Sequence, residues 1–96
     1  MLREPCVYIL ACMKNDIIHT GVTSNLPVRV RQHREKARPG VSSGHQVHRL
    51  VWFETHESMD SAIQREKQLK AGSPEQKRAL VSQLNPHWSD LYCTLL

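Results

Sequence analysis

The sequence predicts a small α/β (α+β) domain, in which a three-stranded, mostly antiparallel sheet is flanked by helices in the order ββαβαα. Three observations lead to this expectation. The chain of 96 residues has room for a single core, so residues 1–96 are expected to form one domain. Two segments rich in β-branched and aromatic residues precede the first helical segment, and a third follows it. Two further segments with helix-start signals complete the order.

The first two elements are expected to form a hairpin. Residues 6–12 are rich in β-branched and aromatic side chains and predict a strand. Turn-forming residues at 13–16 predict a reversal, and residues 17–23 predict the antiparallel return strand. Gly21, inside that second strand, indicates a bulge or a close approach to the backbone.

A helix is expected next, over residues 26–36. Cap-forming residues stand before it, and Pro27 suits its first turn. Arg29 and His33 are four residues apart, so they share one face of this helix. The composition of residues 38–44 predicts a loop after it.

Residues 47–55 predict the third strand. Leu50 and Trp52 are expected on one face of it, and Val51 and Phe53 on the other. Apolar residues on both faces are typical of a strand that is covered on both sides. We therefore expect this strand to be the central one.

The second helix is expected to begin at a cap, Ser58 or Asp60, and to end at Ala71, with Gly72 at the C′ position. Helical spacing predicts one stripe on it that contains Met59, Ala62, Ile63, Glu66 and Leu69. A carboxylate on an apolar stripe must be paired, protonated or bound to a metal, because burying an uncompensated charge is costly. Periodicity alone slightly favours an ion pair with a nearby arginine, or an edge position that still reaches water, over a functional role.

The third helix has a complete start signal. Ser73 is the expected N-cap, Pro74 takes the first helical position and Gln76 completes a capping box. The helix should end before Asn85, since a residue that precedes proline disfavours the helical conformation. The tail is then expected to pack onto the core through Trp88, Leu91 and Tyr92.

Positive charge is concentrated in one part of the chain. The formal net charge is +4, and a ten-residue stretch contains Arg29, Arg31, Arg34, Lys36 and Arg38. Such stretches commonly face polyanions, because releasing counterions from phosphates drives association. A solvated helix face is an equally good interpretation of the charge alone.

The composition predicts a soluble, intracellular (cytoplasmic) protein. No apolar run approaches the roughly 20 residues of a membrane span, and the first residues lack the apolar stretch of a signal peptide. Three cysteines without a C-x-x-C pair indicate reduced thiols. The histidines include one close pair, His45 and His48, but no matching second pair, so a structural zinc site is not expected.

Several of these residues say little when each is considered alone. Together they resemble the GIY-YIG endonuclease superfamily, and in particular its small stand-alone single-domain proteins. Five separated motifs carry the resemblance, in the right order: Val7–Leu10, Gly21–Leu26, Arg29 with His33, Ala62–Lys70 and Leu84–Tyr92. They span almost the whole chain.

The resemblance implies a metal-dependent nuclease site. Glu66 would bind a single divalent cation, Mg²⁺ or Mn²⁺, and Arg29 would hold the scissile phosphate. Tyr8 would activate or orient the attacking water, and His33 would donate to a phosphate oxygen or relay a proton. Asn85 matches a polar helper residue in parts of the superfamily. Non-specific phosphate contacts are expected from Arg31, Arg34, Lys36 and Arg38.

The sequence departs from the family pattern in two places. The second signature tripeptide, normally Tyr-Ile-Gly, reads His19-Thr20-Gly21 here. An imidazole therefore stands where the family has a tyrosine, and it can serve as base or as phosphate ligand. The aromatic residue that usually follows the glutamate helix is replaced by residues 71–74.

The first functional hypothesis is an endonuclease that hydrolyses phosphodiester bonds in DNA and is selective for structure rather than sequence. Its candidate substrates are single-stranded, branched or damaged DNA, and RNA stays open. The alternative is a nucleic-acid-binding module on the same scaffold, with weak or lost cleavage because of His19. A plain interaction domain, whose basic helix is only solvated surface, is the third hypothesis.

Overall fold

The computed structural model describes residues 4–12, 17–36 and 48–95. Its elements follow in the order β1 (Cys6–Cys12), β2 (Ile17–Thr23), α1 (Leu26–Lys36), β3 (His48–Thr55), α2 (Met59–Ala71), α3 (Pro74–Leu84) and η1 (Leu91–Leu95). The predicted ββαβαα order is confirmed, with a 3₁₀ segment, η1, added at the end. The predicted turn at residues 13–16, the loop at 38–44 and the first residue of the third strand, Val47, lie outside the described residues.

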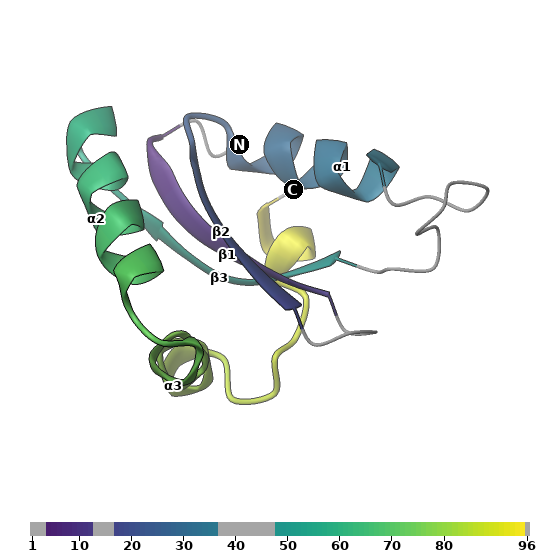
Figure 1. Ribbon diagram of the computed structural model, residues 1–96. Coiled ribbons are helices and arrows are strands. Elements are labelled where there is room, and N and C mark those ends of the chain that lie inside the picture. The colour runs from purple at the N-terminus through teal and green to yellow at the C-terminus, as the bar shows by residue number, and fades with distance from the viewer. Residues whose placement is uncertain (1–3, 13–16, 37–47, 96) are drawn as a thin grey trace.

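The sheet separates two groups of helices. Figure 1 shows α2 and α3 on one side of the three strands, and α1 with η1 on the other. Both strand pairs are antiparallel. No helix in the described part of the chain is long and apolar enough to cross a membrane.

The central strand is β1, and this corrects the expectation that the third strand is central. The order across the sheet is β2-β1-β3. All seven residues of β1 are buried. Strand β3 lies at the edge and is still apolar on both faces, because helices from both layers cover it. Burial on two faces therefore reports the layers around a strand, and not its position within the sheet.

A β-bulge in β3 also overturns the predicted division of its side chains. Trp52 pairs with Ile9 and Leu50 pairs with Leu10, so Val51 is an extra residue opposite two consecutive positions of β1. Val51 and Trp52 consequently lie in one hydrophobic cluster, and Leu50 lies in the other with Phe53 packed against it. Strict alternation fails here because the bulge rotates the following residues by one position.

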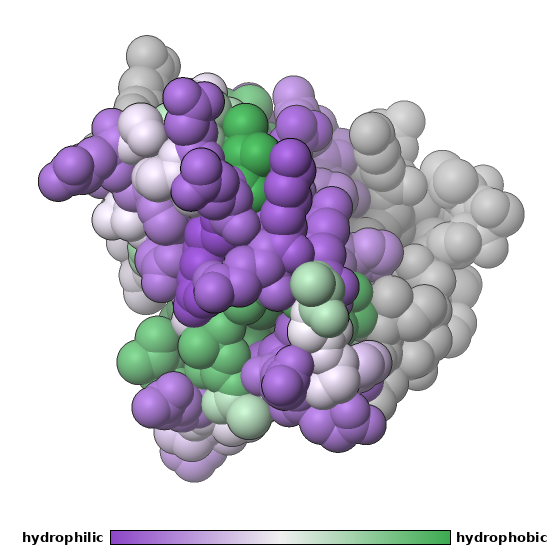
Figure 2. Space-filling view, turned by 60° about the vertical axis from the view of Figure 1, so that its left-hand side comes forward, coloured by the Kyte–Doolittle hydropathy of each residue, from purple (hydrophilic) through white to green (hydrophobic). Residues whose placement is uncertain are grey.

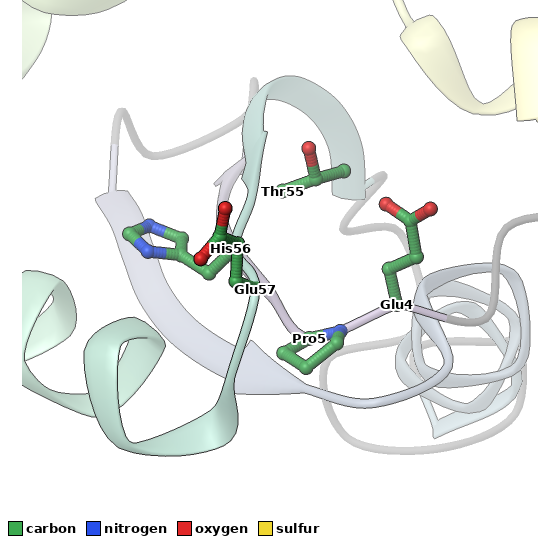
Figure 3. Close-up of a pocket in the computed structure, with 5 residues that line it drawn as sticks. All are labelled: Glu4, Pro5, Thr55, His56 and Glu57. Atoms are coloured by element: carbon green, nitrogen blue, oxygen red, sulfur yellow. The ribbon is translucent and has the colours of Figure 1, made fainter.

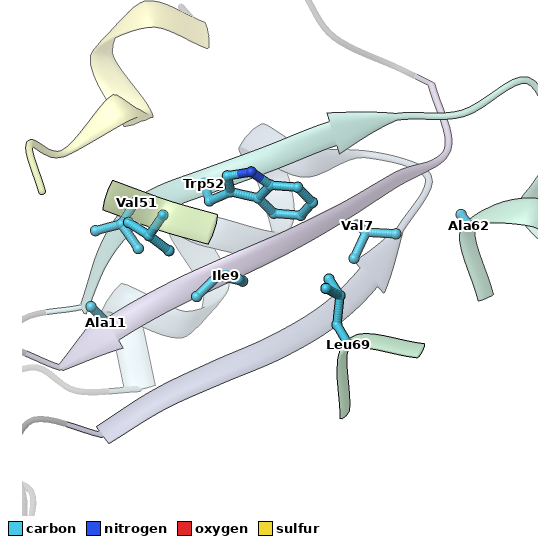
Figure 4. Close-up of a cluster of buried hydrophobic side chains, with 8 residues drawn as sticks. Val7, Ile9, Ala11, Val51, Trp52, Ala62 and Leu69 are labelled. Atoms are coloured by element: carbon cyan, nitrogen blue, oxygen red, sulfur yellow. The ribbon is translucent and has the colours of Figure 1, made fainter. Parts of the chain in front are cut away.

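Each face of the sheet has its own core. Figure 4 shows the cluster beneath α2, in which side chains of β1 and β3 meet Ala62 and Leu69. The second cluster lies under α1, where Leu26 and Val30 pack on the opposite face of β1. The face of β1 that carries Tyr8 therefore looks toward α1.

The helix ends follow their predicted signals. Ser58 caps α2 by accepting a hydrogen bond from the Ser61 backbone. Ser73 and Gln76 form the full capping box of α3, with Pro74 in its first turn. Gly72 differs from expectation, because it ends α2 in an extended conformation and not in a left-handed one.

The C-terminal segment is fastened to α1. Asp90 forms an ion pair with Arg34 and accepts the backbone N–H groups of Leu50 (3.2 Å) and Tyr92 (3.1 Å). The Arg34 guanidinium also lies 4.6 Å from the centre of the Tyr92 ring. One carboxylate thus ties together a helix, a strand and the tail. The predicted packing of Trp88, Leu91 and Tyr92 onto the core is confirmed.

Candidate functional site

Tyr8 lies on the face of the sheet that α1 covers. It sits in β1 directly opposite Gly21 of β2, and the residue is 4% exposed. A Cβ atom added at Gly21 would be 2.5 Å from the Tyr8 hydroxyl oxygen. The phenol ring therefore crosses β2 above the glycine. This is the close approach that the glycine inside the strand predicted.

The Tyr8 hydroxyl meets His33, which comes from α1. The hydroxyl oxygen is 3.4 Å from His33 Nε2. The two rings are packed edge to face, with centroids 6.2 Å apart and an interplanar angle of 67°. Residues 25 positions apart in the sequence are thereby joined at one point.

Two charged groups also act on the Tyr8 hydroxyl. Burial raises the pKa of the Tyr8 phenol, and the negative charge of Glu66 raises it as well, whereas the positive charge of Arg29 lowers it. Burial is the largest of these causes, so the phenol is neutral at physiological pH. Arg29 and Glu66 therefore lie close enough to one hydroxyl group to influence its ionisation from two different helices.

Helix α1 presents Arg29 and His33 because of its spacing. Leu26 and Val30 are buried against the sheet, while Arg29 is exposed and His33 is half-buried. The helix start is fixed by Asn25, whose side-chain oxygen accepts the Val28 N–H at 3.4 Å. The two i, i+4 pairs thus lie on different faces, one for packing and one toward Tyr8.

His19 lies on β2, two residues from Gly21 and opposite Leu10. Directly paired residues of neighbouring strands project on the same face of a sheet, so His19 is on the Tyr8 face. Its side chain is exposed. The structure therefore gives the imidazole access to solvent on the same face of the sheet as Tyr8.

Glu66 approaches from α2. Its side chain is 17% exposed, and its Oε2 atom lies 3.3 Å from the ammonium of Lys70, one helical turn further on. Periodicity favours either an ion pair with an arginine or an edge position that still reaches water. The ion pair is present, but its cationic partner is Lys70 and not an arginine. The i, i+4 spacing of the two residues was available to predict this partner.

The other flank of α2 is anchored to β3 by a polar network. Arg65 donates to Glu54 Oε1 at 3.2 Å and lies 6.0 Å from the centre of the Trp52 ring. His56 donates to the same oxygen at 2.8 Å, since a carboxylate can only accept, and its other ring nitrogen is 3.0 Å from the Ser61 hydroxyl. Arg65 thus holds α2 from one side, while its neighbour in the chain, Glu66, is directed to the Tyr8 side.

The four basic residues expected to contact phosphates differ in their surroundings. Arg31 is exposed. Arg34 is engaged by Asp90 and Tyr92, as described above, which gives it a role in holding the tail. The side chain of Lys36 and the whole of Arg38 lie outside the described residues.

Asn85 performs a structural task away from Tyr8. Its amide nitrogen donates to the carbonyl oxygens of Val51 (3.0 Å) and Ser89 (2.9 Å), and its amide oxygen accepts the Ser89 N–H (3.1 Å). Both amide hydrogens are used, and the side chain is buried. It therefore secures the turn after α3 against β3.

The surface hollow drawn in Figure 3 lies elsewhere and has the wrong charge for a phosphate. Glu4 and Glu57 border it from opposite sides, together with Pro5, Thr55 and His56. Two carboxylates repel a polyanion. This pocket is therefore not the candidate site.

The outer surface of α2 is polar. Figure 2, which brings that side of the molecule forward, shows mainly hydrophilic side chains at the height of α2 and a hydrophobic area lower down, at the level of α3. Helix α3 carries the exposed Leu84.

Comparison with known proteins identifies similar sequences. Residues 4–78 match the family described as the GIY-YIG catalytic domain. A UPF0213 protein of Clostridium perfringens is 36% identical over 76 residues, which cover 79% of this chain and 81% of the relative. A UPF0213 protein of Natronomonas pharaonis is 32% identical over 82 residues, covering 85% of this chain and 95% of the relative.

A solved structure shares the fold. The solution NMR structure of a UPF0213 protein from Bacillus halodurans is 28% identical and superimposes with a TM-score of 0.59. The match covers 90% of each chain.

Proposed function

Because this chain belongs to the GIY-YIG catalytic domain family, we propose that it is a divalent-metal-dependent endonuclease that hydrolyses phosphodiester bonds in DNA and selects structure rather than sequence. The candidate substrates are single-stranded, branched or damaged DNA.

One observation carries the proposal. The Tyr8 hydroxyl is 3.4 Å from His33 Nε2 and lies under the electrostatic influence of both Arg29 and Glu66. These four residues come from β1, α1 and α2, and they bring an imidazole, a guanidinium and a carboxylate into hydrogen-bonding or electrostatic range of one phenol. Phosphodiester hydrolysis uses such a set, because it needs a cation to bind the phosphate, groups to orient water and a carboxylate to hold a metal.

Glu66 is the proposed metal ligand. Among the residues that the structure describes, no three of the His, Cys, Asp and Glu side chains come together as a metal cluster. One carboxylate fits Mg²⁺ or Mn²⁺, hard cations that take their remaining ligands from waters and phosphate oxygens. The Glu66 carboxylate already has one cationic neighbour, the Lys70 ammonium. When bound, the metal would stabilise the leaving oxygen and the charge on phosphorus.

The remaining roles follow from protonation state and shape. Arg29 is exposed and always charged, and its fork of donors suits two phosphate oxygens. A neutral phenol at Tyr8 donates a hydrogen bond and orients water or phosphate, and it is a poor base at neutral pH. His33 holds the phenol in position and can donate to a phosphate oxygen. His19 is the proposed base or phosphate ligand on β2.

A second function, nucleic-acid binding with weak or lost cleavage, is favoured by one feature. His19 stands where the family's second signature tripeptide has tyrosine. The basic residues of α1 could bind nucleic acid equally well in a protein that cleaves it poorly or not at all.

Cleavage of a mixed pool of single-stranded, duplex and branched DNA tests the proposal. We expect products in Mg²⁺ or Mn²⁺ and none in EDTA, and loss of the products in the Glu66→Gln variant. If the protein shifts DNA in a gel but gives no cleavage products with Mg²⁺ or Mn²⁺, the nucleic-acid-binding module would be favoured instead. Absence of both would leave the plain interaction domain.

A further inference from the structure

We propose that Lys70 is an exchangeable counter-cation for Glu66: its ammonium neutralises the carboxylate before a divalent cation arrives, and then moves to the phosphate backbone of the nucleic acid. This inference rests on the proposed metal role of Glu66 and adds a second cationic group to the same site. The ion pair between Lys70 and Glu66 is the observation behind it.

The two partners differ in their exposure to solvent. The Glu66 side chain is 17% exposed, whereas the Lys70 side chain is 55% exposed. A largely covered carboxylate has lost part of its hydration and needs a cation nearby. The lysine has kept its hydration and can swing away without any change in the packing of α2. Losing the ion pair would therefore leave the carboxylate poorly solvated, whereas the lysine would remain solvated by water.

The strength of the pair also suits exchange. Ion pairs between residues four apart on a helix are weak when one partner is as exposed as Lys70, and salt screens them. A divalent cation carries twice the charge of an ammonium and binds directly to carboxylate oxygens. The ammonium is therefore a competitor that the metal can displace, and it raises the metal concentration that is needed.

A displaced ammonium remains tethered near the site. Lysine is a compact point charge on a flexible four-carbon stem, which makes it a common phosphate ligand. Because Lys70 Nζ lies 3.3 Å from Glu66 Oε2, a phosphate bound beside Glu66 would be within reach of the ammonium. The released positive charge then adds to that of Arg29 across the face.

The first test measures metal affinity without DNA. Mn²⁺ is titrated by calorimetry into wild type, Lys70→Met, Lys67→Met and Glu66→Gln, each first shown to be folded by circular dichroism. Lys67 is the matched control, because it is an exposed lysine on the same helix. Removing a competing charge at this distance should tighten Mn²⁺ binding by about three- to tenfold in Lys70→Met, and Lys67→Met should change it far less.

The outcomes separate this inference from the proposed function. Equal effects of Lys70→Met and Lys67→Met, including no effect of either, would overturn the exchange of Lys70 while leaving the metal role of Glu66 intact. If Glu66→Gln bound Mn²⁺ as tightly as wild type does, the metal would lie elsewhere. The metal-binding role in the proposed function would then fail.

The second test follows the lysine itself, in EDTA. Binding of a short DNA duplex is measured against salt concentration. Glu66→Gln releases Lys70 to the backbone, so the log–log slope should steepen by about 0.9, the value for one added phosphate contact. The steepening should vanish when Glu66→Gln is combined with Lys70→Met and persist when it is combined with Lys67→Met. The same steepening in both combinations would be a general charge effect and would overturn the transfer of Lys70 to phosphate.

Discussion

The phenol of Tyr8 lies across the backbone of Gly21, and a Cβ atom at position 21 would be 2.5 Å from the phenol oxygen and 2.6 Å from Cζ. Glycine is required here for steric reasons and not for its backbone freedom, since its φ angle lies outside the left-handed region that favours glycine. The contact fixes the height of the hydroxyl above β2, where it meets His33. A residue without a side chain thus determines where the most central polar group of the site stands.

Gly21→Ala should therefore destabilise the protein, although alanine is usually the better residue inside a strand. The added methyl group would push against a buried ring, and such overpacking costs about 1–3 kcal/mol. Urea unfolding of Gly21→Ala measures the loss. In a Tyr8→Ala background the ring is gone, so Gly21→Ala should be neutral or slightly stabilising there. An equal loss in both backgrounds would contradict the contact.

Stability should also depend on the ionisation of Tyr8 in alkali. Burial raises the pKa of this phenol above its ordinary value of about 10. Its contribution is then fully present below pH about 10, and it is lost as the pH rises toward the folded-state pKa. The unfolding midpoint of wild type should therefore fall more steeply above that pH than the midpoint of Tyr8→Phe. Tyr92 is common to both proteins, so parallel curves would mean that the Tyr8 phenol ionises as it does in water.

Glu66→Gln should separate chemistry from binding. The amide keeps the size of the side chain and removes the charge that would hold the cation. Cleavage should fall by roughly two orders of magnitude or more, as for loss of a main electrostatic group in a site, while DNA affinity in EDTA stays the same or increases. Product formation on a gel and fluorescence anisotropy measure the two quantities. Loss of both to a similar degree would assign Glu66 to folding, which its thermal midpoint would reveal.

Substitutions of His19 should reveal its role in cleavage. A base or a phosphate ligand at this position would take part in the chemical step, so His19→Ala should lose most of the rate. His19→Tyr restores the residue type of the family's second signature tripeptide and should keep some activity. Cleavage rates of wild type and both variants, measured under the same conditions, check this. A wild-type rate in His19→Ala would reduce His19 to an ordinary exposed strand residue.

Arg31 and Arg34, close together on α1, should respond differently to the same change. Arg31→Gln should lower the log–log salt slope of duplex binding by up to about 0.9, as for one lost phosphate contact, and leave the thermal midpoint unchanged. Arg34→Gln should lower stability by about 0.5–2 kcal/mol, because it leaves Asp90 without its ion pair at a partly covered position. Thermal melts of both variants measure the stability, and salt titrations of duplex binding measure the slope. Identical behaviour of the two would show that the ion pair with Asp90 does not hold the tail in solution.

Local signals in the sequence determined the elements of this protein. The capping box at Ser73 and the proline after Asn85 fixed both ends of α3, because caps and prolines act on backbone groups within four residues. The spacing of Arg29 and His33 placed them on one helix face for the same local reason. The family motifs then supplied the residues of the site, since their order along the chain is a property of the sequence.

Only the tertiary structure decided what depends on contacts between distant segments. Strand β1 is central because β2 and β3 both pair with it, and no local pattern encodes that choice. The bulge at Val51 depends on register with β1, and it moved Trp52 to the other core. Hydrogen bonds with backbone groups of Val51 and Ser89 gave Asn85 a structural role, and Asp90 drew Arg34 to the tail. The surroundings of each polar group set its charge and its partners, and they are assembled from distant parts of the chain. The sequence could therefore name the residues of the site. It could not tell which of them are candidates for chemistry and which only support the structure.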